Sequence, residues 1–322
     1  MPRHPRRPHR PRPRGGGIVT ITKTEAIARI EEIDTGTKVR RARSPKSWSD
    51  IALNVWGVLV LLFLFAPIIV IVIYSFNSGR LLIAWDGFGF DAFATILEKP
   101  AIQNAVRVSL ITAFFAAIIA TALGTLAGIA MARHPGKWTW WFLGLLLFVS
   151  VTPEIVDAVA LLPWMVFLGQ DAGLTMFNDG LVRLSVGSSL FATAVVSYIV
   201  RARLIGQDAN LEEASGDLYA NPIATFLKVT LPLALPAVLA GFLLAFTLSL
   251  DNTVIAAFVQ VSGTTPWPVY VLSAVRSGMR PEIAAVSTVM LLLTLVALAL
   301  VALVLKRAGD SATEIARTMT GG

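Results

Sequence analysis

Four polar residues that can contact cations lie inside long apolar runs of the chain. Glu154 and Asp157 are three positions apart, so a helix places both carboxylates on one face. Asp251 and Asn252 are adjacent in a later apolar run. Carboxylates inside a membrane are costly and mark functional sites by default. These side chains could replace water around the ammonium groups of an organic cation, and all four could face a central translocation path.

The same residues also have a structural explanation. The carboxylates could hydrogen-bond backbone groups that Pro153 frees, because proline removes one helix bond. They could also pair with Arg107 or Arg183, which lie near the ends of apolar runs. We place Asp251 about fifteen residues into its run, roughly 22 Å from the inner end at 1.5 Å per residue. From the residues alone, both interpretations remain open.

The composition is that of an integral membrane protein. Of the 322 residues 55% are apolar and only 15% are charged, against roughly 25% in soluble domains. The mean hydropathy is +0.71. Because cysteine is absent, disulfides and thiolate metal sites are excluded.

No pattern predicts a metal, a cofactor or ATP hydrolysis. The three histidines, His4, His9 and His134, have no metal-ligand spacing. The Gly136-Lys137 pair has Met131 where the first glycine of a phosphate-binding loop would stand. We therefore expect no metal site, no catalytic residue and no cofactor.

Six apolar runs are long enough to span a bilayer, which takes about 20 residues. They cover residues 51–76, 102–131, 138–168, 184–200, 237–258 and 284–305. Gly124 and Gly128 form a GxxxG pattern in the second run, which predicts close helix packing. The chain is thus predicted to be an all-α membrane protein with six transmembrane helices.

Positive charge is concentrated in the first 48 residues and in alternate loops. Thirteen of the 27 Lys and Arg precede residue 51. The positive-inside rule then predicts that both termini and the loop 201–236 are cytoplasmic. We expect a disordered basic tail over 1–48 that can adhere to anionic lipid, a transmembrane domain over 49–307 and a C-terminal tail over 308–322. The charge belongs to a tail, so we expect no nucleic-acid partner.

The loop 201–236 is the longest polar interruption between apolar runs after residue 50. It predicts two short helices. Asn210 can cap the first, with Glu213 completing a capping box. Leu211, Ala214 and Leu218 then form an apolar stripe at helical spacing.

The second short helix begins after Asn221, because Pro222 is favoured at the first helical position. Pro232 and Pro236 are predicted to end it before the next apolar run. Together the two helices would form an apolar ridge at the membrane surface that fits a groove in another protein.

This loop resembles the EAA signature of permease subunits of ATP-binding-cassette (ABC) importers. Glu213-Ala214-Ser215 is followed by Tyr219 and by Val229-Thr230-Leu231-Pro232, where the family has glycine and then Ile-x-Leu-Pro. The segments PLALPAVLAGFLLAFTLSLDNTVIAAF and RPEIAA are similar to the spermidine/putrescine branch. The resemblance runs from about residue 53 to 304.

The resemblance implies a type I importer permease that does not hydrolyse ATP itself. It implies a cytoplasmic coupling helix that docks on the ATPase subunit. The residues implied in this contact are Leu211, Glu212, Glu213, Ala214, Ser215, Leu218, Tyr219 and Ala220. It further implies two ATP-binding subunits, a second, different permease subunit, an extracytoplasmic binding protein and a location in the bacterial inner membrane.

Two departures from the family pattern stand out. Tyr219 replaces glycine, and a left-handed backbone there would cost roughly 1–2 kcal/mol unless Asn221 takes over the turn. Asn252 stands where the branch usually has a second aspartate.

Other functions remain open. The ligand could be a phosphonate, an opine, thiamine or iron, because similar permeases serve those importers. A secondary transporter that uses the carboxylates as a relay, or a membrane-anchored scaffold, would have no need of a docking helix.

Overall fold

The computed structural model describes residues 48–79, 84–208, 210–278 and 280–307. Every regular element in these ranges is helical, apart from an isolated bridge between Asn77 and Phe88. The helices are α2 (Trp48–Tyr74), α3 (Asp91–Glu98), α4 (Pro100–Arg133), α5 (Lys137–Val151), α6 (Glu154–Gln170), η1 (Thr175–Asn178), α7 (Gly180–Ile205), α8 (Asn210–Asp217), α9 (Pro222–Thr225), η2 (Phe226–Thr230), α10 (Leu231–Asp251), α11 (Val254–Val259), α12 (Trp267–Ser277) and α13 (Pro281–Arg307).

The chain divides into two compact units between Leu64 and Phe65, inside α2. The predicted tails over 1–47 and 308–322 lie outside the described residues, so their expected disorder is not addressed by the structure. The unit that begins at Phe65 contains the features that follow.

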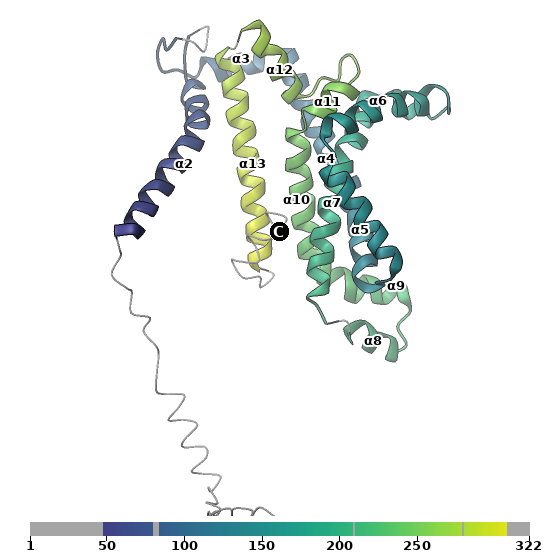
Figure 1. Ribbon diagram of the computed structural model, residues 1–322. Coiled ribbons are helices and arrows are strands. Elements are labelled where there is room, and N and C mark those ends of the chain that lie inside the picture. The colour runs from purple at the N-terminus through teal and green to yellow at the C-terminus, as the bar shows by residue number, and fades with distance from the viewer. Residues whose placement is uncertain (1–47, 80–83, 209, 279, 308–322) are drawn as a thin grey trace, which may run out of the picture. The chain divides into compact units, whose positions relative to one another are not determined.

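Within the described ranges, five helices are long and apolar enough to cross a membrane, or six spans if the bent pair α5 and α6 counts as one. These correspond to the six predicted runs, so the all-α class with five or six spans is confirmed. In Figure 1, α4, α7, α10 and α13 run alongside one another, with α8 and α9 at one end.

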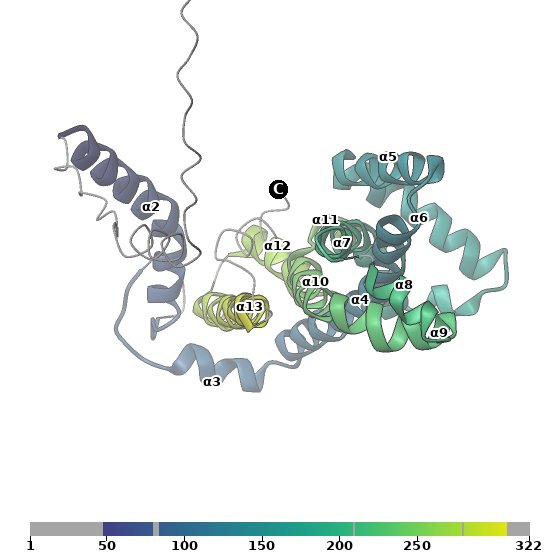
Figure 2. The same cartoon turned by 90° about the horizontal axis from the view of Figure 1, so that it is seen from below.

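Small residues hold α4, α7 and α10 in close contact. A side chain at Gly124 would place its Cβ 2.7 Å from Val196 Cβ, and one at Gly128 would lie 2.8 Å from Val200 Cβ. The GxxxG pattern therefore does set a tight α4–α7 contact, as predicted. Val196 and Val200 belong to one buried core with residues of α4 and α10, and Figure 2 shows these helices grouped when viewed along their length.

The third predicted span, 138–168, consists of two helices that meet at Pro153. α5 ends at Val151 and α6 begins at Glu154, with a bend of 103° between them. Thr152 and Pro153 both adopt extended backbone, with ψ near 130°. Proline disfavours the helical conformation of the residue before it, so α5 ends before Thr152 and the chain there is extended.

The predicted bounds of the fifth span, 237–258, were wrong. Pro232 and Pro236 do not end a helix. They lie within α10, which continues from α9 through the π-helical turn η2 to form a 30-residue span over Pro222–Asp251. Pro232 lies in the first turn of α10, directly after the π turn, where proline is tolerated, and Pro236 lies inside the helix. The helix stops instead at Asp251, before Phe258.

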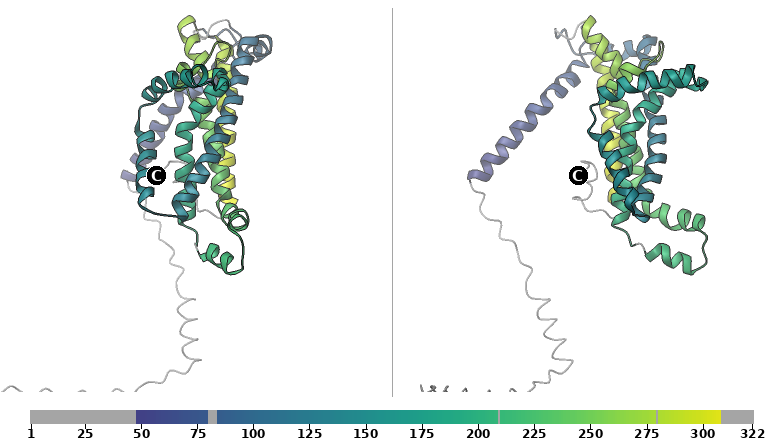
Figure 3. Two further views of the ribbon diagram at one scale, coloured as in Figure 1. Left: turned by 90° about the vertical axis from the view of Figure 1, so that its right-hand side faces the viewer. Right: turned by 45° about the vertical axis from the view of Figure 1, so that its right-hand side comes forward.

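The other end of the bundle is fastened by polar contacts between segments distant in sequence. Lys99 Nζ pairs with the mostly buried carboxylate of Glu282 at the start of α13. The Trp267 N–H of α12 donates to Ser109 Oγ of α4, 2.7 Å away. Figure 3 shows α6 and α12 at this end and α8 and α9 at the opposite one.

Candidate functional site: a docking loop and carboxylates at helix ends

The polar loop folds into the two short helices that the sequence predicts, α8 and α9. Asn221 caps α9, since its Oδ1 accepts from the Ala224 N–H at 2.7 Å, and Pro222 opens the helix. The predicted capping box of α8 does not form as expected. Asn210 is already helical, and its N–H donates to Asp208 Oδ1 at 3.0 Å, so Asp208 has the role expected of Glu213.

The turn between the helices is left-handed at Tyr219, where φ is 58°. The Ala220 N–H donates to the Ser215 carbonyl and the Tyr219 N–H to the Gly216 carbonyl. These two bonds form a Schellman motif, which usually has glycine at this position. Asn221 does not take over the turn, because its φ is −73°. Tyrosine therefore adopts the backbone conformation that the family glycine would adopt more easily.

The structure divides the eight predicted contact residues into two sets. Five are exposed: Leu211, Glu213, Ala214, Leu218 and Tyr219. Glu212, Ser215 and Ala220 are half-buried. Ile223 and Leu227 on the following segments are also exposed, at 71% and 54%. We call the five exposed residues with Ile223 and Leu227 the docking face. Large apolar side chains exposed together mark interaction surfaces.

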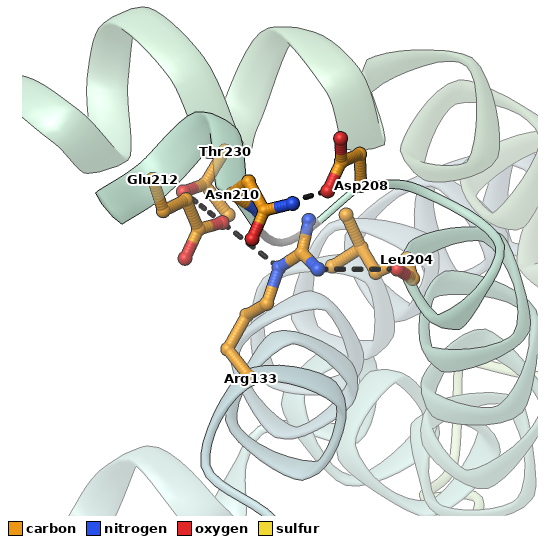
Figure 4. Close-up of polar contacts among 6 residues, drawn as sticks. All are labelled: Arg133, Leu204, Asp208, Asn210, Glu212 and Thr230. Atoms are coloured by element: carbon orange, nitrogen blue, oxygen red, sulfur yellow. Dashed lines mark hydrogen bonds and ion pairs between the residues drawn. The ribbon is translucent and has the colours of Figure 1, made fainter. Parts of the chain in front are cut away.

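Glu212 connects the docking loop to the membrane helices (Figure 4). Its Oε1 lies 2.8 Å from Nε of Arg133, the last residue of α4. Its Oε1 also accepts from Thr230 Oγ1 at 2.8 Å, in the π turn before α10. Arg133 Nη1 donates to the Leu204 carbonyl of α7 at 3.3 Å. A second bond, 2.8 Å between Ser215 and Thr225 hydroxyls, joins α8 to α9.

Sequence reasoning missed Arg133 as a site residue. Its position at the end of a long apolar run identified it only as a cytoplasmic positive charge. No spacing rule connects residue 133 with residue 212, because their contact depends on how α4 and the loop pack. The buried Glu282 that pairs with Lys99 was missed for the same reason.

The four predicted path residues lie at ends of helices. Glu154 and Asp157 occupy the first turn of α6, where the helix dipole favours negative charge. Glu154 is exposed and Asp157 is half-buried. Ala158 packs in one core with Ile255 of α11, so α6 lies against the helix that follows Asp251 and Asn252.

Asp251 is the last residue of α10 and is exposed. Asp251 lies twenty residues after Leu231, the first residue of α10, which is about 30 Å along the helix at 1.5 Å per residue. Its depth in the membrane stays a prediction. Asn252 caps the next helix, since its Oδ1 accepts from the Ile255 N–H at 3.1 Å. One of the four residues thus has a clear structural role.

A small polar cavity lies between α4, α7 and the end of α10. Ser109, Thr112, Ser188 and Ser249 line it together with Asn252, and its volume is about 10 Å³. Thr112 Oγ1 and Ser249 Oγ are buried without a hydrogen-bond partner among the described residues. A water molecule requires about this much space, so the cavity excludes an organic cation.

A bundle of apolar spans with an exposed apolar loop defines a membrane permease that works with a partner protein. The chain matches the family described as "Binding-protein-dependent transport system inner membrane component" over residues 124–313, and it belongs to that family. It is accordingly a multi-pass inner-membrane protein and a non-catalytic ABC importer permease. An ATPase subunit and a substrate-binding protein are the partners that this class implies.

Two relatives are similar over most of their length. The putrescine transport system permease protein PotI of Escherichia coli (strain K12) is 38% identical over 242 residues, which cover 73% of this chain and 85% of the relative. The spermidine/putrescine transport system permease protein PotC of Haemophilus influenzae is 34% identical, over 79% of this chain and 96% of the relative.

A solved structure supports the fold. A chain of a bacterial ABC transporter involved in the import of the acidic polysaccharide alginate matches with a TM-score of 0.61. The match covers 81% of this chain and 95% of the other at 15% sequence identity. The resemblance to type I importer permeases predicted from the loop is therefore confirmed.

Proposed function

We propose that this chain forms the translocation path of an importer for putrescine, spermidine or a similar small organic cation. The observation that supports this most is the 38% identity with a putrescine permease across 73% of the chain. The match extends well beyond the docking loop, which any importer of this class needs. The similarity is thus not confined to the part of the chain that would bind the ATPase.

The docking face is the part of the chain that binds the ATPase subunit. Leu218 and Tyr219 are 81% and 97% exposed in the Schellman turn that ends the short helix α8. A rigid helix with an exposed apolar stripe fits a hydrophobic groove. Closure of the ATPase pair would pull the loop, and the membrane helices would rock between outward-open and inward-open states.

The complete transporter would contain this chain, a second and different permease subunit, two ATP-binding subunits and an extracytoplasmic binding protein. The second permease subunit is expected to complete the translocation path. Glu154, Asp157 and Asp251, with Asn252 beside them, remain our candidates for contact with the cation.

The cytoplasmic side of the protein is the end that carries α8 and α9. Arg133 ends α4, Lys137 begins α5, Arg201 lies near the end of α7 and Lys228 lies in η2, all close in sequence to α8 and α9, which supports this orientation by the positive-inside rule. The end of α13 lies at the same end of the bundle (Figure 1). We therefore propose that both termini are cytoplasmic.

Uptake of labelled putrescine and spermidine tests the ligand. Cells with and without the gene are compared at low external concentration, with an energy-depleted control. We expect deletion to remove a saturable, ATP-dependent component. If uptake of both polyamines is unchanged, the ligand is a different small solute, such as a phosphonate, an opine, thiamine or iron.

Replacing Glu213 by Ala separates an importer from a secondary transporter. Glu213 lies on the exposed side of α8 and makes no contribution to the Arg133 pair. An importer should lose ATP-coupled uptake while the chain still inserts. A secondary transporter that uses the carboxylates as a relay would keep its uptake.

A further inference from the structure

We propose that Arg133 is a positioning residue that fastens the docking loop to α4, so that the loop and the membrane helices move as one body. The inference rests on the proposed function, because it describes how a pull on α8 reaches the translocation path. It concerns an interaction within this chain and differs from the contact of the docking face with the ATPase.

Burial makes the Arg133 contact specific. The Arg133 side chain is only 6% exposed, and Glu212 is 22% exposed. A guanidinium group buried to this extent needs its partners, since an unpaired buried charge is strongly destabilising. Its Nε faces Glu212 of α8 and its Nη1 bonds the Leu204 carbonyl of α7 (Figure 4). One side chain of α4 therefore contacts both the loop and the helix that leads into it.

Glu212 extends the connection to α10. Its carboxylate accepts from Thr230 Oγ1 while it faces Arg133. Thr230 is 4% exposed and lies in the π turn that leads directly into α10. Arg133, Glu212 and Thr230 thus connect α4, α8 and the start of α10 through side chains alone.

The number of places at which α8 is attached determines whether it can rotate relative to the membrane helices. The backbone attaches α8 at two places, through residues 206–209 to α7 and through α9 to α10. A body held at two points can still pivot about the line that joins them. The Glu212–Thr230 and Ser215–Thr225 bonds attach α8 to the same two segments, η2 and α9. The Arg133–Glu212 pair adds an attachment to another helix, α4, and so restricts this pivot.

The helices that receive the three attachments are themselves tightly packed. Gly124 and Gly128 leave no space between α4 and α7, and a β-carbon at Gly241 of α10 would lie 3.1 Å from Val196 of α7. Closely packed interiors transmit displacement. A pull on α8 would therefore move α4, α7 and α10 together. Without the Arg133 contact, the docking loop would rotate when α8 is pulled, and the membrane helices would move less.

The adjacent glutamates of α8 then have different tasks. Glu212 is turned inward and holds the loop, whereas Glu213 is exposed and belongs to the docking face. Loss of Glu213 should weaken ATPase binding. Loss of Glu212 or Arg133 should leave binding in place and uncouple it from transport.

The test uses the complete transporter in proteoliposomes with its ATPase, second permease and binding protein. We compare Arg133→Met and Glu212→Gln with the unchanged chain. The first substitution keeps most of the side-chain length without the charge, and the second keeps an acceptor for Thr230. The matched control is Lys137→Met, which removes an exposed cation at the first residue of α5. The quantity measured is the number of ATP molecules hydrolysed per putrescine molecule imported.

A distance measurement between α4 and α8 tests directly whether Arg133 fixes the docking loop. Because the chain has no cysteine, spin labels can be attached at His134→Cys and Asp217→Cys, both exposed positions on either side of the contact. In the unchanged background we expect one narrow distance distribution. In Arg133→Met and Glu212→Gln we expect a broad one, together with at least a fivefold rise in ATP hydrolysed per molecule imported. Lys137→Met should change neither quantity.

Two outcomes would contradict the proposed role of Arg133. Narrow distributions in both variants would show that other contacts hold the loop, and broad distributions with unchanged stoichiometry would show that the connection does not serve coupling. Either result overturns the inference. If one variant fails to insert, the other carries the test. If the unchanged transporter imports no polyamine, the proposed ligand fails, and the distance distributions decide separately whether Arg133 holds the loop.

Discussion

The docking loop and the helix breaks near the path carboxylates both consist of polar residues at helix ends, yet they differ in how they are held. Local bonds define the loop: the Asn221 cap, the Schellman turn at Tyr219 and the hydroxyl pair of Ser215 and Thr225. At the breaks, Glu154 and Asp251 are exposed at the ends of helices.

The difference indicates where each region obtains its partners. Bonds within this chain hold the docking loop in shape, and the docking face is exposed on it. The carboxylates at the breaks lack such a network, and Asn252 is the member of that group with a clear bond of its own. We propose that a second permease subunit and a cationic solute provide the partners of these carboxylates. The variants below test this contrast, beginning with the largest expected effect.

An aspartate in the docking face should abolish transport. We expect Leu211→Asp to lose ATPase binding and ATP-dependent uptake, because a buried interface residue of this kind contributes about 2 kcal/mol or more. The measurement is co-purification of the ATPase with the permease. Leu174→Asp is a matched control, since Leu174 is 47% exposed against 46% for Leu211 and precedes η1 at the other end of the bundle. Equal loss in both variants would contradict a specific docking face.

Removing the charge of Asp251 should weaken recognition of the cation without disturbing the loop. A charge-assisted hydrogen bond contributes about 1.5–3 kcal/mol, so Asp251→Asn should raise the KM for putrescine uptake about tenfold or more. Saturation curves of uptake give this value. The control Asp171→Asn removes an exposed carboxylate at the end of α6. An unchanged KM in Asp251→Asn would remove this residue from the path.

The cap at Asn252 predicts a smaller effect on stability. Asn252→Ala removes the acceptor for the Ile255 N–H and should destabilise the protein by about 1 kcal/mol. Asn252→Asp keeps an acceptor and should be close to neutral. Thermal unfolding of the detergent-purified chain distinguishes the two. If aspartate and alanine destabilise equally, the cap does not explain the residue.

The turn at Tyr219 offers the smallest effect and one of opposite sign. Tyr219→Gly relieves the left-handed backbone of a residue with a β-carbon, which should stabilise the turn by about 1 kcal/mol. Hydrogen exchange at the Ala220 N–H, which bonds the Ser215 carbonyl, should slow about fivefold. Tyr219→Ala keeps the strain and serves as the control. Slower exchange in alanine as well would mean that the side chain, and not the backbone, limits the turn.

Sequence patterns predicted the features that depend on neighbouring residues. The apolar runs predicted the spans, the GxxxG pattern predicted the α4–α7 contact, and Asn221-Pro222 predicted the start of α9. The left-handed turn fell where a departure from the family glycine had been noticed. These features depend on bonds within a few residues or on hydrophobicity summed over a window.

Features that depend on packing were not predicted. The chain bends by 103° after Val151, where the backbone before Pro153 is extended. In α10, by contrast, the helix continues through Pro232 and Pro236 and follows a π turn. The Arg133–Glu212 pair joins residues 79 positions apart. Periodicity carries no information on such pairs, so the structure was needed to find the residue that holds the docking loop.

The most direct test of the account is site-specific crosslinking to the ATPase. Single cysteines placed at Leu218 and at Leu174 in the cysteine-free chain carry a photoactivated crosslinker, in the assembled transporter. Leu218 is 81% exposed in the docking face, and Leu174 lies at the other end of the bundle. We predict a crosslink to the ATPase from Leu218 and none from Leu174. A crosslink from Leu174 alone, or from neither position, would contradict docking at α8 and α9.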